Sequence, residues 1–301
     1  CFLPQTNPQT EPVMARTPKS CCIPAIVLIL LTLGLTSCTR VITGTIVQPT
    51  VDNLQRQTDL YLVCEGAPAY LLTIDSMIAS SPQNLDLLRI AAQSYGSYGA
   101  ALSECGAGTN RIGAIADKAR LYGLTLISRI LPGIAADRRE ALDLELAALS
   151  RRDVPPLFWG AMAWLSWIQQ QQGSPEAMAD LVVVEKIMTR LLALDESYQA
   201  GSIHLFFAAL QATRPAMLGG DPEASRHHFD RALELSRHRF LLVHTSYAET
   251  LARMTLDKDL HDRLLAEVIA FDIAAAPEFA LANQIAKRKA ARLLAEEYFA
   301  E

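Results

Sequence analysis

The sequence lacks the residue patterns that carry most enzyme and cofactor chemistry. It contains no HExxH pair of histidines, no CxxC pair of cysteines and no GxSxG turn around a serine. The glycine-rich stretch at 106–113 has neither the spacing of a phosphate-binding GxxxxGK[ST] loop nor that of a GxGxxG motif. These absences argue against a zinc protease, a thioredoxin-like protein, an α/β-hydrolase and a nucleotide-binding enzyme. We therefore expect no enzyme activity and no cofactor, and we interpret 106–113 as a loop.

Histidines are few, and their spacing does not suggest a metal site. The six are His204, His227, His228, His238, His244 and His261. His227 and His228 are adjacent, so on a helix their side chains point about 100° apart and cannot easily share one ion. From the sequence alone we expect no bound metal.

The chain also lacks an excess of basic charge. Its 27 Lys and Arg residues are outnumbered by 32 Asp and Glu residues, which gives a formal net charge of −5. The two signs are interleaved along the chain rather than clustered. We therefore expect no nucleic-acid partner and no electrostatic membrane-binding patch.

The N-terminal region contains an uncharged, largely apolar run at 20–39. Arg16 and Lys19 precede this run, and small residues follow the apolar part just before Cys38. The order of positive, apolar and small residues is typical of a secretory signal. The tetrapeptide LTSC, which ends at Cys38, is similar to the end of a bacterial lipoprotein signal. We expect lipidation at Cys38, with an uncleaved anchor helix as the alternative.

This interpretation divides the chain into four parts. Residues 1–13 are interpreted as a non-native or untranslated extension and 14–37 as the lipoprotein signal peptide. A tether at 38–50 then leads into a single α-helical repeat domain at 51–301. The residue after Cys38 is Thr39 rather than Asp, which favours the outer membrane as the site of the anchor.

The domain is predicted to be all-α and built from stacked helical hairpins. Apolar residues recur at spacings of three and four almost everywhere. The segments GSPEA at 173–177 and GDPEA at 220–224 each place a capping residue before a proline and a glutamate, as at a helix start. Residues 160–193 and 201–235 therefore resemble two copies of one helix–turn–helix unit. We expect a degenerate tetratricopeptide-like repeat.

Two cysteines remain in the predicted domain, Cys64 and Cys105. If helices at 67–79 and 84–103 form a hairpin, both cysteines lie at the same end of it. A disulfide and two separate reduced cysteines are both compatible with that arrangement.

Large aromatic residues gather in two predicted helices. All three tryptophans, Trp159, Trp164 and Trp167, lie within 155–168, and Phe206 and Phe207 lie within 201–212. We regard these five residues as a candidate ligand or partner surface. Ordinary packing between hairpins is the alternative.

Three separated blocks, at 64–102, 153–168 and 218–253, resemble the T-component family of tripartite ATP-independent periplasmic (TRAP) transporters. The resemblance implies an all-helical periplasmic lipoprotein. It also implies action beside the TRAP substrate-binding protein, which feeds a cation-driven membrane permease. No catalytic residues are carried over, and only Cys38 transfers as a functional position.

Two functions remain open at this point. The first is an accessory protein that docks the substrate-binding protein and holds or passes an apolar solute. The second is a structural α-repeat lipoprotein that scaffolds envelope complexes and has no solute site. A homo-oligomer is compatible with both.

Overall fold

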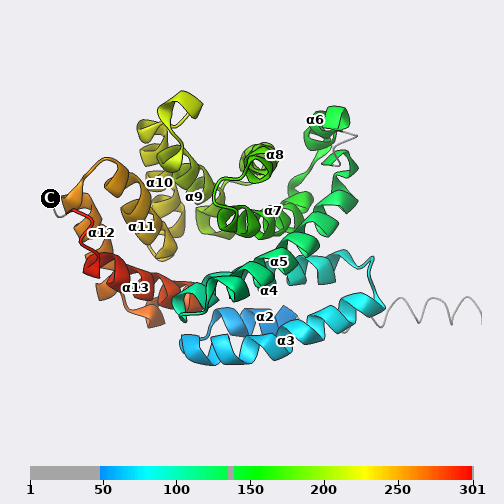
Figure 1. Cartoon of the computed structure of the whole chain (residues 1–301), viewed down its shortest axis with the longest axis horizontal. Coiled ribbons are helices and arrows are strands. Elements are labelled where there is room, and N and C mark those ends of the chain that lie inside the picture. The colour runs from blue at the N-terminus through cyan, green and yellow to red at the C-terminus, as the bar shows by residue number, and fades with distance from the viewer. Residues whose placement is uncertain (1–47, 135–138, 300–301) are drawn as a thin grey trace, which may run out of the picture.

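The computed structural model describes residues 48–134 and 139–299, which are entirely helices and connecting turns (Figure 1). The α-helices of these residues are α2 (Gln48–Gln55), α3 (Leu60–Ser80), α4 (Leu85–Glu104), α5 (Thr109–Ile130), α6 (Arg139–Ala148), α7 (Val154–Gln170), α8 (Pro175–Leu194), α9 (Tyr198–Thr213), α10 (Pro222–Ser236), α11 (Leu242–Tyr247), α12 (Lys258–Ala270) and α13 (Ala280–Ala295). The all-α prediction is confirmed.

The helix starts follow the capping residues that the sequence indicates. Ser174 accepts a hydrogen bond from the backbone N–H of Ala177 at the start of α8. Asp221 accepts hydrogen bonds from the backbone N–H groups of Glu223 and Ala224 at the start of α10. Each cap satisfies N–H groups that the first helical turn leaves without partners. The two predicted helix pairs are therefore present as α7–α8 and α9–α10.

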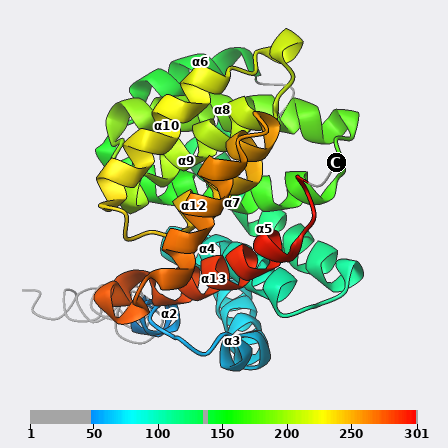
Figure 2. The ribbon, with the colours of Figure 1, turned by 90° about the vertical axis from the view of Figure 1, so that its left-hand side faces the viewer.

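Successive helices are arranged around an arc, and the last helix returns to the first (Figure 1). Figure 2 shows α13 running between α12 and the α2–α3 region. Leu281 and Ile285 of α13 belong to the same buried apolar cluster as residues of α3 and α4. The Arg288 side chain donates a hydrogen bond to the carbonyl of Glu104 at the end of α4. The C-terminal helix thus stabilises the N-terminal hairpin.

Helices α5 and α7 cross at a pair of glycines. A Cβ atom built on Gly123 would lie 2.6 Å from the carbonyl oxygen of Gly160. A Cβ on Gly160 would lie 2.7 Å from the Ile127 side chain. Only the absence of a side chain lets the two backbones approach this closely. Near this crossing, Trp167 of α7 lies against α5, where its indole N–H reaches Asp117.

By length and composition alone, one helix in the described ranges, α3, is long and apolar enough to cross a membrane. The same helix contributes Leu60, Leu71 and Ile74 to the apolar core, and its opposite face is exposed. Length and hydropathy do not distinguish a core helix from a spanning one, so this match is weak evidence for a span.

Several element boundaries differ from the predictions. The predicted loop at 106–113 was wrong beyond Gly108, because α5 begins at Thr109. Helix α2 begins at Gln48, inside the predicted tether. Helix α9 contains left-handed backbone at Gln199, Ala200 and Gly201, so its regular part begins after Gly201. Local sequence does not predict left-handed backbone at a glutamine and an alanine.

Candidate functional site

The predicted lipidation site, Cys38, lies outside the described residues. So do the predicted signal peptide and all but the last residues of the tether.

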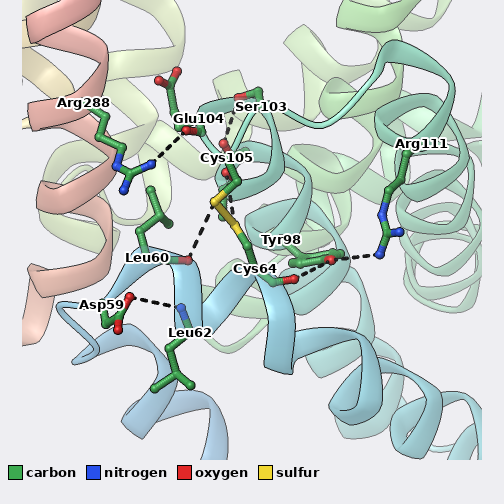
Figure 3. The surroundings of a disulfide bond; sticks show 12 residues. Asp59, Leu60, Leu62, Cys64, Tyr98, Ser103, Glu104, Cys105, Arg111 and Arg288 are labelled. Atoms are coloured by element: carbon green, nitrogen blue, oxygen red, sulfur yellow. Dashed lines mark hydrogen bonds between the residues drawn. A yellow bond between two sulfur atoms is a disulfide. The ribbon is translucent and has the colours of Figure 1, made fainter.

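Cys64 of α3 and Cys105, which caps the end of α4, form a disulfide (Figure 3). Their Cα atoms are 6.7 Å apart, and 41 positions separate them in the sequence. The Tyr98 hydroxyl donates a hydrogen bond to the Cys64 carbonyl, and Arg111 of α5 donates to the Tyr98 hydroxyl. The bond joins the start of α3 to the end of α4 and closes that hairpin.

The tryptophans of α7 are held by carboxylates of neighbouring helices. The Trp164 indole N–H donates to Asp180 of α8 at 2.9 Å, and the Trp167 indole N–H donates to Asp117 of α5 at 3.0 Å. The Arg120 guanidinium lies 3.7 Å from the centre of a Trp167 ring, close enough for a cation–π contact. Arg120 also donates to Asp180 at 3.0 Å. Both indoles therefore have their polar atoms satisfied inside the helix packing.

The other predicted aromatic residues also pack against protein. Phe206 and Phe207 are buried, and Trp159 is half-buried with its ring edge-on to Phe158. Phe207 stacks on the ring of His228. The described part of the chain contains an open cleft and a small apolar cavity. None of the five predicted aromatic residues lines either of them.

The larger cavity is an open cleft of about 640 Å³ where the end of α8, the start of α9 and the middle of α10 meet. Its lining residues are Arg151, Leu192, Ala193, Leu194, Asp195, Glu196, Ser197, His204, His227 and His228. The cleft therefore presents acidic, basic and imidazole groups beside a short apolar wall. The left-handed residues at the start of α9 lie next to this lining.

A chain of polar contacts runs along the cleft. Glu196 forms an ion pair with Arg231 of α10, at 2.5 Å, and its other carboxylate oxygen lies 3.1 Å from Nε2 of His204. Nδ1 of His204 lies 2.8 Å from Nδ1 of His228. If neutral His204 donates from Nε2 to the carboxylate, its Nδ1 must accept, so His228 donates from its Nδ1. A proton can lie on only one of the two Nδ1 atoms, so this contact requires at least one of the imidazoles to be neutral.

The pKa values of the cleft residues follow from these contacts. Burial, together with the nearby imidazoles of His204 and His227, lowers the pKa of His228 to about 4. Burial also lowers the pKa of His204, which Glu196 only partly opposes. The hydrogen bonds from Arg231 and His204 lower the pKa of Glu196 to about 2. At neutral pH this chain of contacts therefore joins the Arg231 guanidinium, the Glu196 carboxylate and the neutral imidazoles of His204 and His228.

The smaller cavity lies between α2, α3, α4 and α13 and has a volume of about 50 Å³. Its lining is mostly apolar and includes Val51, Val63, Leu71 and Leu281. Pockets that bind small organic ligands usually measure about 300–1,000 Å³. This cavity is therefore too small to hold such a ligand.

Sequence reasoning identified His227 and His228 but missed the partner of the second. His204 and His228 lie on the two helices of a hairpin that the sequence predicts. Comparing the residues that face each other across this hairpin would have suggested the pair. The partners of the tryptophans carried no local signal, because Asp117 is 50 residues from Trp167.

Comparison with known proteins gives one positive result. The family model described as the TRAP transporter T-component matches residues 56–299. A search of curated proteins finds no match for the chain. The matched segment extends from the end of α2 to the last described residue and includes both the cleft and the disulfide hairpin. The chain therefore belongs to the TRAP transporter T-component family.

Proposed function

We propose that this protein is a lipid-anchored periplasmic component of a TRAP-type solute uptake system. In this proposal it docks the substrate-binding protein and, through it, serves the membrane permease. The observation that carries the proposal is the family match over 56–299, which covers nearly all of the described residues. Membership in the family supports an accessory role in a TRAP transporter, and the docking step is our inference.

We favour docking over solute transfer because the indole N–H groups of the candidate aromatic surface are already hydrogen-bonded within the protein. The indole N–H groups of Trp164 and Trp167 are bonded to the buried carboxylate of Asp180 and the exposed carboxylate of Asp117, and Arg120 covers the Trp167 ring. An apolar solute at that place would have to displace these contacts. The open cleft, by contrast, offers charged groups of both signs, which suits the polar part of a protein interface.

A binding measurement with matched charge reversals tests the docking proposal. Arg151, at the cleft, and Lys258, at the start of α12, are both exposed cations in single ion pairs. Residues 39–301 should bind the TRAP substrate-binding protein of the same cell in isothermal titration calorimetry. The Arg151→Glu variant should bind at least tenfold more weakly, and Lys258→Glu should bind normally. No binding by the unchanged protein would favour the scaffold alternative.

The solute part of the prediction has its own readout. Mass spectrometry of an organic extract of the protein, purified without refolding, would reveal a stoichiometric apolar molecule if the protein holds one. Its presence would restore a solute role beside docking. Its absence, together with binding to the substrate-binding protein, would leave docking alone.

The anchor is tested by fractionation. Lipidated Cys38 should hold the full-length protein in the membrane fraction, because two or more acyl chains on one residue give stable anchoring. A Cys38→Ser variant with an otherwise intact signal should lose that lipid. We expect the lipid-bearing protein in the outer-membrane fraction and no incorporation of labelled fatty acid into the variant. Equal labelling of both proteins would contradict the proposal.

A further inference from the structure

A second group of histidines lies away from the cleft, where α10, α11 and α12 meet. His238 is in the turn after α10, His244 is on α11, and Glu267 is on α12. One ligand atom from each residue can be chosen such that all three lie within 4.8 Å of one another. The group therefore brings two imidazoles and one carboxylate from three separate segments to one point.

The turn after α10 fixes the position of His238. Arg237 and His238 both have left-handed backbone, with φ angles of 52° and 56°. The His238 N–H donates to the Leu233 carbonyl, which closes the end of the helix in the manner of a Schellman motif. The His238 ring consequently lies 5.6 Å from the ring of His244.

His244 is the buried member of the group. Its side chain is 2% exposed, and its Nε2 lies 3.5 Å from a carboxylate oxygen of Glu267. That separation is too long for a normal hydrogen bond. Its Nδ1 is buried on the other side of the ring, where the backbone of Phe240, four residues earlier, is the polar group close enough to raise its pKa. The nitrogen that faces Glu267 is therefore Nε2, and it is the His244 atom available to a ligand on that side.

The cleft histidines His204 and His228 differ from this group because each already has a hydrogen-bond partner. There, His204 is hydrogen-bonded to His228 on one side and to Glu196 on the other. A metal ion at that place would have to break those bonds. Within the described ranges no hydrogen bond joins the rings of His238 and His244 to each other or to Glu267, so a metal ion held through Nε2 of His244 would displace none.

We propose that His238, His244 and Glu267 form a binding site for a transition-metal dication of the zinc type. Two imidazoles and a carboxylate suit Zn²⁺, which usually takes three protein ligands and a water molecule at an open site. Bond lengths of about 2.0–2.1 Å place tetrahedral ligand atoms about 3.4 Å apart. Binding therefore requires the two exposed side chains, His238 and Glu267, to rotate until separations of up to 4.8 Å shorten to that value. Their exposure leaves the fourth position open to solvent.

The bound ion would join the α10–α11 turn, α11 and α12. Helix α11 continues into a π-helical segment, Ala248–Ala252, and such segments often occur at functional sites. A ligand that binds only the folded state stabilises it by mass action. The inference does not depend on docking, because it rests on the geometry of these three residues alone.

The test uses residues 39–301 with the purification tag removed and with metal stripped by a chelator. In calorimetry we expect one equivalent of Zn²⁺ to bind. His238→Ala and Glu267→Gln should each weaken binding at least tenfold, because each removes one ligand from an exposed position that folding does not require. His227→Ala, which removes an exposed histidine at the cleft, should bind zinc normally. Zinc should raise the melting temperature of the unchanged protein and of His227→Ala more than that of either ligand variant.

Three results would overturn the proposal. The first is the absence of stoichiometric zinc binding by the unchanged protein. The second is equal binding by His238→Ala, Glu267→Gln and the unchanged protein. The third is loss of binding in His228→Gln with retention in His238→Ala, which would assign the ion to the cleft.

Discussion

The first half of the described chain, α2 to α7, and the second half, α8 to α13, hold their helices together with different chemistry. The first half contains the disulfide between Cys64 and Cys105 and the close crossing of α5 and α7 at glycine. All six histidines lie in the second half, between positions 204 and 261. The disulfide and the glycine crossing gain no proton between pH 7 and pH 4, whereas the imidazoles of the second half do. The half that contains the cleft should therefore lose more stability as the pH falls through this range.

Asp75 shows that the first half also contains polar contacts, but of another kind. Its carboxylate accepts hydrogen bonds from the Tyr122 hydroxyl at 2.6 Å, the Tyr95 hydroxyl at 2.9 Å and the Lys118 ammonium at 3.1 Å. Burial raises the pKa of Asp75, but these donors outweigh burial and lower it below 3.8. The contribution of this group to stability is present above the ordinary pKa and is lost only as the pH falls through the lowered value.

Removal of the disulfide should have the largest effect on stability. Its two cysteines are separated by 41 positions, and closure of a loop of that length stabilises the folded state by about 4 kcal/mol in the chain-entropy model. The double variant Cys64→Ser/Cys105→Ser should lose about that amount of unfolding free energy in a urea titration. Reduction of the unchanged protein should lower its stability to a similar level. A loss below about 1 kcal/mol would show that α13 alone keeps this hairpin closed.

The glycine crossing should give the next largest effect. Gly123→Ala places a methyl group 2.6 Å from the Gly160 carbonyl oxygen, so the two backbones must separate. We expect a loss of about 2–3 kcal/mol, as is typical of an overpacked core. Gly113 lies earlier in the same helix and has no heavy atom within 4 Å of a built Cβ.

Gly113→Ala is the matched control for this crossing. Alanine is favoured over glycine inside a helix by about 1 kcal/mol, so this variant should be slightly stabilised. Thermal melts of both variants would measure the difference. A destabilised Gly113→Ala, or an unaffected Gly123→Ala, would contradict the packing described for α5 and α7.

The sequence predicts the secondary structure better than it predicts the long-range contacts. The starts of α8 and α10 follow from Ser174 and Asp221, because a cap is a local arrangement of a few residues. The partners of Trp164 and Trp167 depend on how α5, α7 and α8 pack, which no short pattern records. Of the candidate aromatic surface, Trp164 and Trp167 have their indole N–H groups bonded to carboxylates of neighbouring helices.

The histidines illustrate the same limit. The adjacency of His227 and His228 argues against one shared ion between them, but it says nothing about partners on other helices. His238 and His244 meet because two residues at the end of α10 adopt left-handed backbone. Neither residue is a glycine, so the sequence does not indicate that turn.

The pH dependence of the second half should come next in size. Folding lowers the pKa of His228 from an ordinary value near 6.5 to about 4, chiefly through burial. The unfolded chain therefore binds a proton first as the pH falls, and stability is lost from about pH 6.5 down to about pH 4. One such histidine contributes at most about 1.4 kcal/mol per pH unit in that window.

The variant His228→Gln should reduce this slope in urea titrations performed between pH 7.5 and pH 4. The exposed neighbour His227 provides the control, because His227→Gln should leave the slope unchanged. Comparison of slopes rather than absolute stabilities removes the effect of the lost hydrogen bond to His204. Equal slopes for all three proteins would show that protonation of the His204–His228 pair does not limit the stability of this half.

The ion pair of the cleft should give the smallest effect. Glu196 is about half exposed, so solvent screens its attraction to Arg231. Glu196→Gln keeps the shape of the side chain but removes its negative charge, which contacts both Arg231 and His204. We expect a loss of unfolding free energy of about 1 kcal/mol or less, since exposed pairs contribute about that much.

The loss caused by Glu196→Gln should shrink in 1 M salt, where the screening length falls to about 3 Å. Gly123→Ala, measured under the same two conditions, should show no comparable salt dependence, since its cost is steric. A salt-independent loss at Glu196 would mean that its hydrogen bond to His204, rather than its charge, holds the cleft together.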